Sequence, residues 1–191
     1  DANSLLVIDE SFIDFVGNDT LQDNEYSMRS LVNEFDNIIV VHSFTKFYAV
    51  PGLRIGAAFS NPLIIEQLNS FIPTWSVNTL AQSYTEAALN DVEYVKRTKQ
   101  VLHEEQLFMY NSLDTIDGIT VYPPSANFML FHIEQEGITA ESINEALKKY
   151  NIIVRNCDSY MGLNNQWVRV AIKDHDTNVK FVEKLTDILK V

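Results

Sequence analysis

The stretch SFTKFYAVPGLRIG, at residues 43–56, carries the strongest structural signal in this chain. It follows the apolar run Ile38–Val41, which is typical of a strand buried on both faces of a parallel sheet. Within residues 40–63 the charged side chains are two cations, Lys46 and Arg54. Because unpaired cations are costly in apolar surroundings, we expect an anionic ligand to neutralise them.

Two further apolar runs predict strands beside the first one, and helical patterns separate the three. The strands are expected at Leu5–Ile8 and Ile55–Phe59, and the helices over the acidic amphipathic stretch Ser27–Phe35 and from Pro62 to about Pro73. A longer helix is expected from a cap at Asn78 to about Leu113, with a break near Asn90. Strands that alternate with helices predict an α/β fold with a mostly parallel sheet.

After Gly118 the pattern changes to short strands with two helices, which is typical of a small α+β domain. The strands are expected at residues 119–121, 128–131, 152–154 and 167–171, and the helices over residues 140–149, capped by Thr139, and from about residue 176. We place the boundary inside the long helix, with one domain over residues 1–95 and the small domain over residues 96–191.

Composition excludes several classes of protein. The 191 residues carry 14 Lys and Arg against 26 Asp and Glu, a net charge of −12, which disfavours nucleic acid and anionic membranes as partners. One cysteine and four dispersed histidines offer neither an intramolecular disulfide nor the spacing of a metal site. Residues 1–4 lack the basic start of a signal peptide, and no apolar run approaches the roughly 20 residues of a membrane helix. We expect a cytoplasmic protein without a metal.

The position of the first strand suggests a partial chain. A strand buried on both faces needs neighbours on each side, yet Leu5–Ile8 comes almost at the start. We therefore expect this chain to be a fragment.

The stretch around Lys46 resembles the cofactor-lysine segment of the fold type I pyridoxal-phosphate enzymes, the aspartate aminotransferase superfamily. That segment reads S-x-[ST]-K, with an arginine eight residues after the lysine and a glycine two beyond, as in Ser43, Lys46, Arg54 and Gly56. Upstream, Asp9-Glu10-Ser11-Phe12 resembles the D-x-x-[YF] element of the same superfamily. The resemblance implies that residues 1–95 are the C-terminal part of the cofactor-binding large domain.

The resemblance also implies a role for each motif residue, and each role suits its chemistry. Lys46 is the catalytic residue, since its amine condenses with the aldehyde of pyridoxal 5'-phosphate and afterwards acts as a base. Asp9 stabilises the protonated pyridine nitrogen, which keeps the ring electron-poor. Ser43 and Arg54 bind the cofactor phosphate through a hydroxyl and a guanidinium.

Two arginines interrupt apolar strands of the small domain, Arg155 and Arg169. In the branch that contains histidinol-phosphate aminotransferase and threonine-phosphate decarboxylase, arginines at this spacing bind the substrate. The resemblance implies that Arg169 binds the α-carboxylate and Arg155 the phosphate or a neighbouring acid group. An exposed arginine on an edge strand is the alternative reading of each.

The words WSVN, at residues 75–78, and RNCDSYMGL, at residues 155–163, look more like the decarboxylase than the aminotransferase. We therefore expect a decarboxylase-like enzyme for a phosphorylated amino acid, with transamination by 2-oxoglutarate as the alternative. A noncatalytic domain that keeps the fold is the alternative of another class. Relatives of this kind also imply a homodimer.

Three residues depart from the pattern or lack a role. Phe12 stands where many members of the superfamily carry a tyrosine that bonds the cofactor, so we expect Phe12 only to pack. His42 and Cys157 are expected to be structural. The Gly-rich phosphate turn, the ring-stacking aromatic residue and the asparagine of relatives lie upstream of the aligned part, so we expect this fragment alone to be inactive.

Overall fold

The computed structural model describes residues 4–17 and 24–190. Residues 1–3, which belong to the segment judged to lack a signal peptide, lie outside the described part. The chain divides into two compact units, residues 1–97 and 98–191. This division falls inside the long helix α4 (Val92–Asp114), as does the boundary expected from the sequence. The assignment of the units as a cofactor-binding and a small domain stays a prediction.

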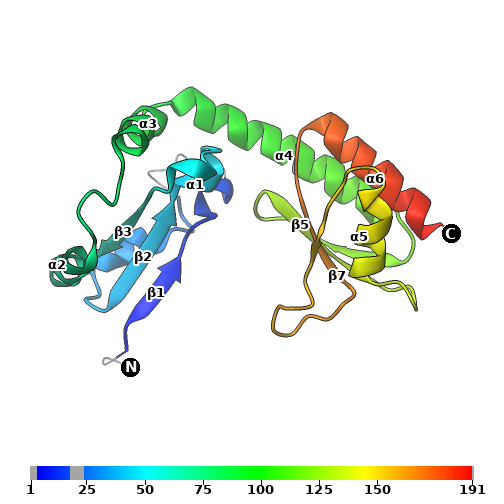
Figure 1. Ribbon diagram of the computed structural model, residues 1–191, viewed down its shortest axis with the longest axis horizontal. Coiled ribbons are helices and arrows are strands. Elements are labelled where there is room, and N and C mark those ends of the chain that lie inside the picture. The colour runs from blue at the N-terminus through cyan, green and yellow to red at the C-terminus, as the bar shows by residue number, and fades with distance from the viewer. Residues whose placement is uncertain (1–3, 18–23, 191) are drawn as a thin grey trace. The chain divides into compact units, whose positions relative to one another are not determined.

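The first unit holds a three-stranded sheet in the order β1-β2-β3 (Figure 1). Its strands are β1 (Leu6–Asp9), β2 (Ile38–Ser43) and β3 (Gly56–Ser60). β1 pairs with β2 in parallel, and β3 pairs with β2 antiparallel. The predicted burial of the central run is confirmed, because Ile38, Ile39 and Val40 are all buried.

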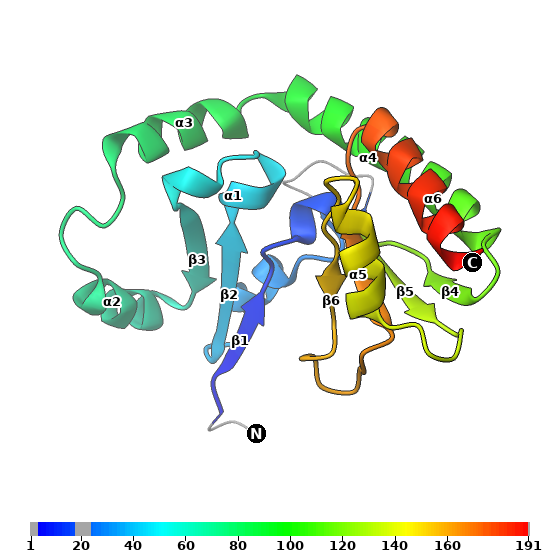
Figure 2. The ribbon, with the colours of Figure 1, turned by 45° about the vertical axis from the view of Figure 1, so that its right-hand side comes forward.

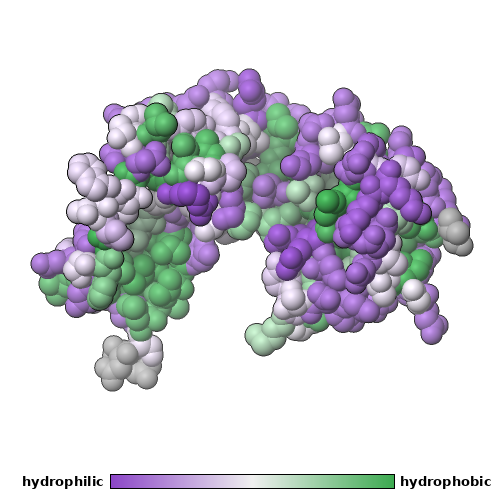
Figure 3. Space-filling model, in the orientation of Figure 1, coloured by the Kyte–Doolittle hydropathy of each residue, from purple (hydrophilic) through white to green (hydrophobic). Residues whose placement is uncertain are grey.

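The predicted burial of β1 is wrong for this chain. Leu6 and Val7 are 52% and 56% exposed, because β1 is an edge strand and no other described strand pairs with its outer side. Apolar side chains gather on the surface over β1 and β2 (Figure 3). Val7 also lines an open apolar groove of about 620 Å³ beside Ile39 and Phe71.

Two helices of the first unit begin where the sequence predicts, at Pro62 and after a cap at Asn78. α2 (Pro62–Phe71) starts with Pro62 in its first turn and with Asn61 accepting a hydrogen bond from the backbone N–H of Leu63. α3 (Thr79–Leu89) is capped by Asn78, and residues 90–91 separate it from α4. The expected helix over Ser27–Phe35 is shorter and tighter, a 3₁₀ segment η2 (Met28–Asn33).

The second unit holds a four-stranded antiparallel sheet in the order β4-β5-β7-β6. Its strands are β4 (Ile119–Tyr122), β5 (Phe128–Ile133), β6 (Arg155–Asn156) and β7 (Trp167–Ala171), and its further helices are α5 (Ala140–Lys148) and α6 (His175–Leu189). Met129, Phe131 and Ile133 are fully buried on one face of β5. Their alternation places Phe128, Leu130 and His132 on the other face.

The strand expected at residues 152–154 is not formed. The backbone N–H of Val154 donates to the Asn144 side chain at 3.0 Å, and that of Ile152 donates to the carbonyl of Leu147. These bonds tie the segment to the end of α5, so strand pairing starts only at Arg155. The predicted cap of α5 is confirmed, since Thr139 and Ser142 bond each other's backbone N–H.

Candidate functional site

Lys46 lies on a short helix at the carboxyl end of β2. This helix, α1 (Phe44–Phe47), begins at the cap residue Ser43, the last residue of β2 (Figure 2). The Lys46 side chain is exposed, and its Nζ lies 4.5 Å from the centre of the Phe12 ring. A cation over an aromatic face is attracted by the ring quadrupole, so Phe12 does more than the packing expected of it.

Burial and two tyrosine hydroxyls hold the backbone that follows Lys46 in place. Phe47 and Tyr48 are buried. The Tyr94 hydroxyl donates to the carbonyl of Phe47 at 2.8 Å, and the Tyr84 hydroxyl donates to the carbonyl of Tyr48 at 3.2 Å. Burial raises the pKa of Tyr48 to about 12, so this neighbour of Lys46 stays neutral. The turn is therefore fixed while the lysine amine remains accessible.

Asp9 is the last residue of β1, and its carboxylate is held in the ionised form. The backbone N–H of Ser11 donates to Oδ1 at 2.8 Å. Hydrogen bonds from the side chain and the backbone of Ser11 lower the pKa of Asp9, and the nearby charge of Lys46 lowers it further. The parallel register pairs Asp9 with Val41, which brings Asp9 and the turn after β2 to the same edge of the sheet.

Ser43 and Arg54 come to this edge through the antiparallel pair. Ser43 lies opposite Gly56, and Arg54 stands two residues before that glycine. A Cβ at Gly56 would lie 2.5 Å from the carbonyl oxygen of His42, so only glycine allows the strands to approach here. The Ser43 hydroxyl bonds that of Thr45 at 2.8 Å, and the exposed Arg54 guanidinium donates to the carbonyl of Pro51 at 2.9 Å.

Arg155 and Arg169 lie directly opposite each other on β6 and β7. Like charges at such a cross-strand position repel, and no carboxylate of the described residues forms an ion pair with either side chain. The Arg155 guanidinium lies 5.7 Å from the centre of the Tyr160 ring, and that of Arg169 lies 5.0 Å from that of Phe128. The two arginines thus bring two positive charges together without an ion-pair partner among the described residues.

Cys157 is buried close to these arginines. Its burial raises the pKa of the thiol, although the charges of Arg169 and Arg155 act in the opposite direction. A buried, protonated thiol is a poor nucleophile, which agrees with the structural role expected of this residue.

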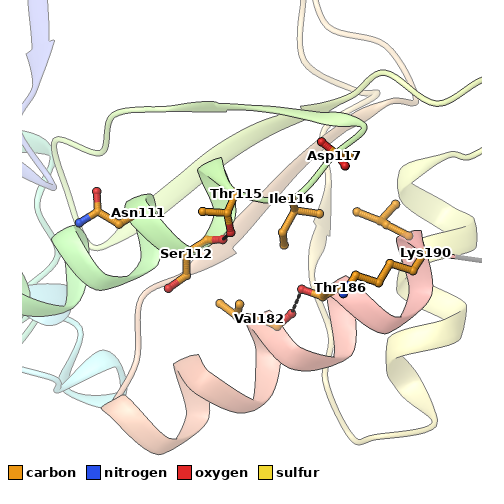
Figure 4. A pocket seen from close by; sticks show the side chains of 9 residues that line it. Asn111, Ser112, Thr115, Ile116, Asp117, Val182, Thr186 and Lys190 are labelled. Atoms are coloured by element: carbon orange, nitrogen blue, oxygen red, sulfur yellow. Dashed lines mark hydrogen bonds between the residues drawn. The ribbon is translucent and has the colours of Figure 1, made fainter.

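A separate open hollow of about 730 Å³ lies in the second unit and contains none of the predicted site residues (Figure 4). Its polar lining includes Asn111, Ser112 and Thr115 near the end of α4, and Thr186 and Lys190 at the end of α6. Within the described part of the chain no cluster of three His, Cys, Asp or Glu side chains could hold a metal ion, and no helix could span a membrane.

Sequence reasoning missed the contacts that support the motif residues. It gave no partner to His42, whose Nε2 lies 2.8 Å from Oδ2 of Asp14. It also did not foresee Tyr84 and Tyr94, far along the chain, bonding the lysine turn. No spacing signal links such pairs, because only the folded sheet and helices bring them together.

The chain is similar in sequence to a family of aminotransferases and to several curated proteins. The model of the aminotransferase class I and II family matches residues 1–185. Histidinol-phosphate aminotransferase of Methanosphaera stadtmanae is 32% identical over 98% of this chain and 49% of that protein. Threonine-phosphate decarboxylase of Salmonella typhimurium is 34% identical over 98% of this chain and 49% of that protein.

The structural comparison agrees with the sequence comparison. The crystal structure of the histidinol-phosphate aminotransferase from Clostridium acetobutylicum has a TM-score of 0.89 and 29% identity, and covers 97% of this chain and 54% of that one. The predicted α/β fold of a fold type I pyridoxal-phosphate enzyme is confirmed. The chain spans about half the length of the curated relatives it matches.

The bonds to Asp9 lead to a prediction. Ser11→Ala removes the side-chain hydrogen bond to Asp9 but keeps the backbone one, so the pKa of Asp9 should rise while staying below its usual value. Titration of the Asp9 carboxyl carbon by NMR measures this pKa. Thr177→Ala is a matched control, because it removes the equivalent bond to Asp174 in the second unit and should raise the pKa of Asp174 alone. An unchanged Asp9 pKa in Ser11→Ala would show that the Ser11 side chain does not hold the carboxylate ionised.

Proposed function

Since the chain belongs to the aminotransferase class I and II family, whose members use pyridoxal phosphate, we propose that it is part of a pyridoxal-phosphate enzyme that acts on a phosphorylated amino acid. The observation that carries the proposal is the grouping of Lys46 and Asp9 at one sheet edge, with Lys46 near enough to lower the pKa of Asp9. The proposed reaction is loss of carbon dioxide from the substrate, as in the decarboxylase relative.

The residues at this edge suit the cofactor. Pyridoxal phosphate needs an amine for its aldehyde, an anion for its ring nitrogen and cations or hydroxyls for its phosphate. Lys46 supplies an accessible amine, Asp9 an ionised carboxylate, and Arg54 a guanidinium with no ion-pair partner among the described residues. Ser43 adds a hydroxyl at the start of α1. We therefore assign the cofactor-binding role to Asp9, Ser43, Lys46 and Arg54.

The cofactor, when bound, supplies an electron sink that weakens bonds to the substrate α carbon. Lys46 binds the cofactor between turnovers and then holds or moves a proton at Nζ. The Phe12 ring and the anchored turn limit where that amine can lie. Asp9, whose pKa the bonds to Ser11 lower, would hold the ring nitrogen and would stabilise a positive charge on it.

The opposed arginines suit a substrate with two acid groups. We assign the α-carboxylate to Arg169 and the phosphate or a neighbouring acid group to Arg155, as the family resemblance implies, and a guanidinium fork suits either anion. Two anions would offset the positive charge of the opposed side chains. The alternative of an exposed edge-strand arginine fits Arg155 on β6 but not Arg169, because β7 is paired on both sides.

Transamination is the second candidate, and the histidinol-phosphate aminotransferase relative favours it. The same residues serve either reaction. The two reactions differ in which group leaves the substrate α carbon, the carboxylate in decarboxylation or the proton in transamination. The orientation that the arginines impose on the substrate decides between them. The words at residues 75–78 and 155–163 favour the decarboxylase.

The proposed setting is a cytoplasmic homodimer that binds neither nucleic acid nor membranes. The net charge of −12 opposes binding to anionic polymers and surfaces. The lone cysteine suits a reducing compartment. Phe71, Trp75 and Leu80 are exposed apolar side chains around the segment between α2 and α3, as expected of an interface.

Lys46 is expected to be the lysine that binds the cofactor. Borohydride reduction of the native full-length protein with pyridoxal phosphate should fix the cofactor on the peptide that contains Lys46, and Lys46→Ala should abolish the visible absorption of the complex. Lys96→Ala is the control and should change neither result, since Lys96 lies on α4 outside the motif. Labelling of another lysine in the wild-type protein would refute the assignment.

Arg54 and Arg169 are expected to act on different ligands. Arg54→Leu should raise the Kd for pyridoxal phosphate about 10- to 100-fold, since a charge-assisted bond contributes about 1.5–3 kcal/mol, with a smaller effect on substrate affinity. Arg169→Leu should do the reverse. Cofactor titration and substrate-induced spectral changes measure the two affinities. If both variants lose both affinities equally, the two arginines have been misassigned.

The reaction itself separates the candidates. Native full-length protein should release carbon dioxide and aminopropanol phosphate from O-phosphothreonine, and should form no glutamate from histidinol phosphate with 2-oxoglutarate. Glutamate from the second pair without gas from the first would establish the aminotransferase instead. Neither product, in a protein whose Lys46 is not labelled, would support the noncatalytic alternative.

A further inference from the structure

A buried hydrogen-bonded pair joins the two segments that carry the proposed cofactor residues. Nε2 of His42 lies 2.8 Å from Oδ2 of Asp14, and their side chains are only 3% and 4% exposed. His42 directly precedes Ser43 at the end of β2, and Asp14 lies in the 3₁₀ segment η1 (Ile13–Phe15) that follows Asp9. The proposed catalytic mechanism uses neither residue.

The pair fixes the orientation of both side chains. The other ring nitrogen of His42, Nδ1, is buried without a hydrogen-bond partner among the described residues. The bond to Asp14 is therefore the polar contact that orients the imidazole, whose ring also packs 5.0 Å from that of Phe44 at the start of α1. A change at Asp14 reaches the lysine helix through two contacts.

The segment that contains Asp14 is also held by local hydrogen bonds and ring contacts. The backbone N–H groups of Ile13 and Phe15 donate to the carbonyls of Glu10 and Phe12, which closes the turn after Asp9. Phe12, whose ring lies under the Lys46 amine, directly precedes η1. Phe15 packs on Phe47 at 5.2 Å between ring centres. Displacement of Asp14 would therefore shift the ring on which Lys46 rests.

Stability alone gives little reason to keep such a pair. Burying polar side chains is costly, and apolar residues of similar volume often serve a buried site equally well or better. A buried hydrogen-bonded pair does impose one defined geometry, since its partners must meet at hydrogen-bond distance. Here the pair links the turn after Asp9 with the turn that carries Lys46.

We propose that Asp14 and His42 are positioning residues that hold the Asp9–Phe12 turn against the Lys46 helix and so set the position of the Lys46 amine. The inference rests on the proposed function, because it assigns the pair to the cofactor lysine. It adds two residues that touch neither cofactor nor substrate and act through Phe12 and Phe44.

The test uses native full-length protein and a double variant, His42→Phe with Asp14→Leu. The double variant removes both polar partners at once and leaves neither buried without the other, so it should keep the fold even where His42→Phe alone does not. One measurement is the rate at which borohydride fixes pyridoxal phosphate on Lys46. The other, made without cofactor, is amide hydrogen exchange in residues 10–16 and 43–48.

In the double variant we expect fixation on Lys46 to slow about tenfold or more, because a small displacement of a reacting group is costly. Exchange in both segments should be faster, since the bond that joins them is gone. His175→Phe is the control, because His175 forms a histidine–carboxylate pair with Glu105 in the second unit at 3.0 Å, although this histidine is largely exposed. It should leave fixation and both segments unchanged.

The outcomes separate the two proposals. Fixation within twofold of wild type in a folded double variant would overturn the positioning role, even with faster exchange, because the pair would then be merely structural. Wild-type exchange in both segments would overturn it as well. If wild-type protein fails to label Lys46 while the double variant still exchanges faster, the proposed function fails and the structural link between the turns stands.

Discussion

The parallel pairing of β1 with β2 is the constraint on which the candidate site depends. Carboxyl ends of adjacent parallel strands meet at one edge, so the register that pairs Asp9 with Val41 brings a carboxylate and an amine together across a long separation in sequence. The antiparallel strand β3 then returns Arg54 to the same edge through the close approach at Gly56. Without this register Asp9 would not lie beside the other three polar motif residues, Ser43, Lys46 and Arg54.

The sequence predicted what is encoded locally. The caps at Asn78 and Thr139 are short-range patterns, and the structure forms both. The sequence did not predict the contact partners of the site residues, because strand register and helix packing bring those partners into place. Arg155 faces Arg169 only through the pairing of a two-residue strand, and His42 meets Asp14 only once β1 lies beside β2. Residue type indicated the chemistry, but not which neighbour holds each group in place.

The exposed first strand shows a different limit of sequence reasoning. Leu6 and Val7 have the composition of an interior strand, yet they lie at an edge. An apolar pattern reports the environment for which a segment is suited, whereas exposure depends on which other segments are present to cover it. At the Lys46 turn the sequence pattern and the observed exposure agree. Phe47 and Tyr48 are apolar and buried, and the lysine between buried neighbours is left accessible.

The opposed arginines complete the argument from structure to function. Like charges directly opposite each other across a strand pair disfavour the sheet, and the rings of Tyr160 and Phe128 each lie close to one of the two guanidinium groups. Since apolar or oppositely charged residues at these positions would favour folding, the opposed pair motivates the proposal of an anionic ligand. Under that proposal, a substrate with two acid groups would lie against two cations that have no ion-pair partner among the described residues. Asp9 differs from the two arginines in this respect, because hydrogen bonds from Ser11 stabilise its charge in the protein without a ligand.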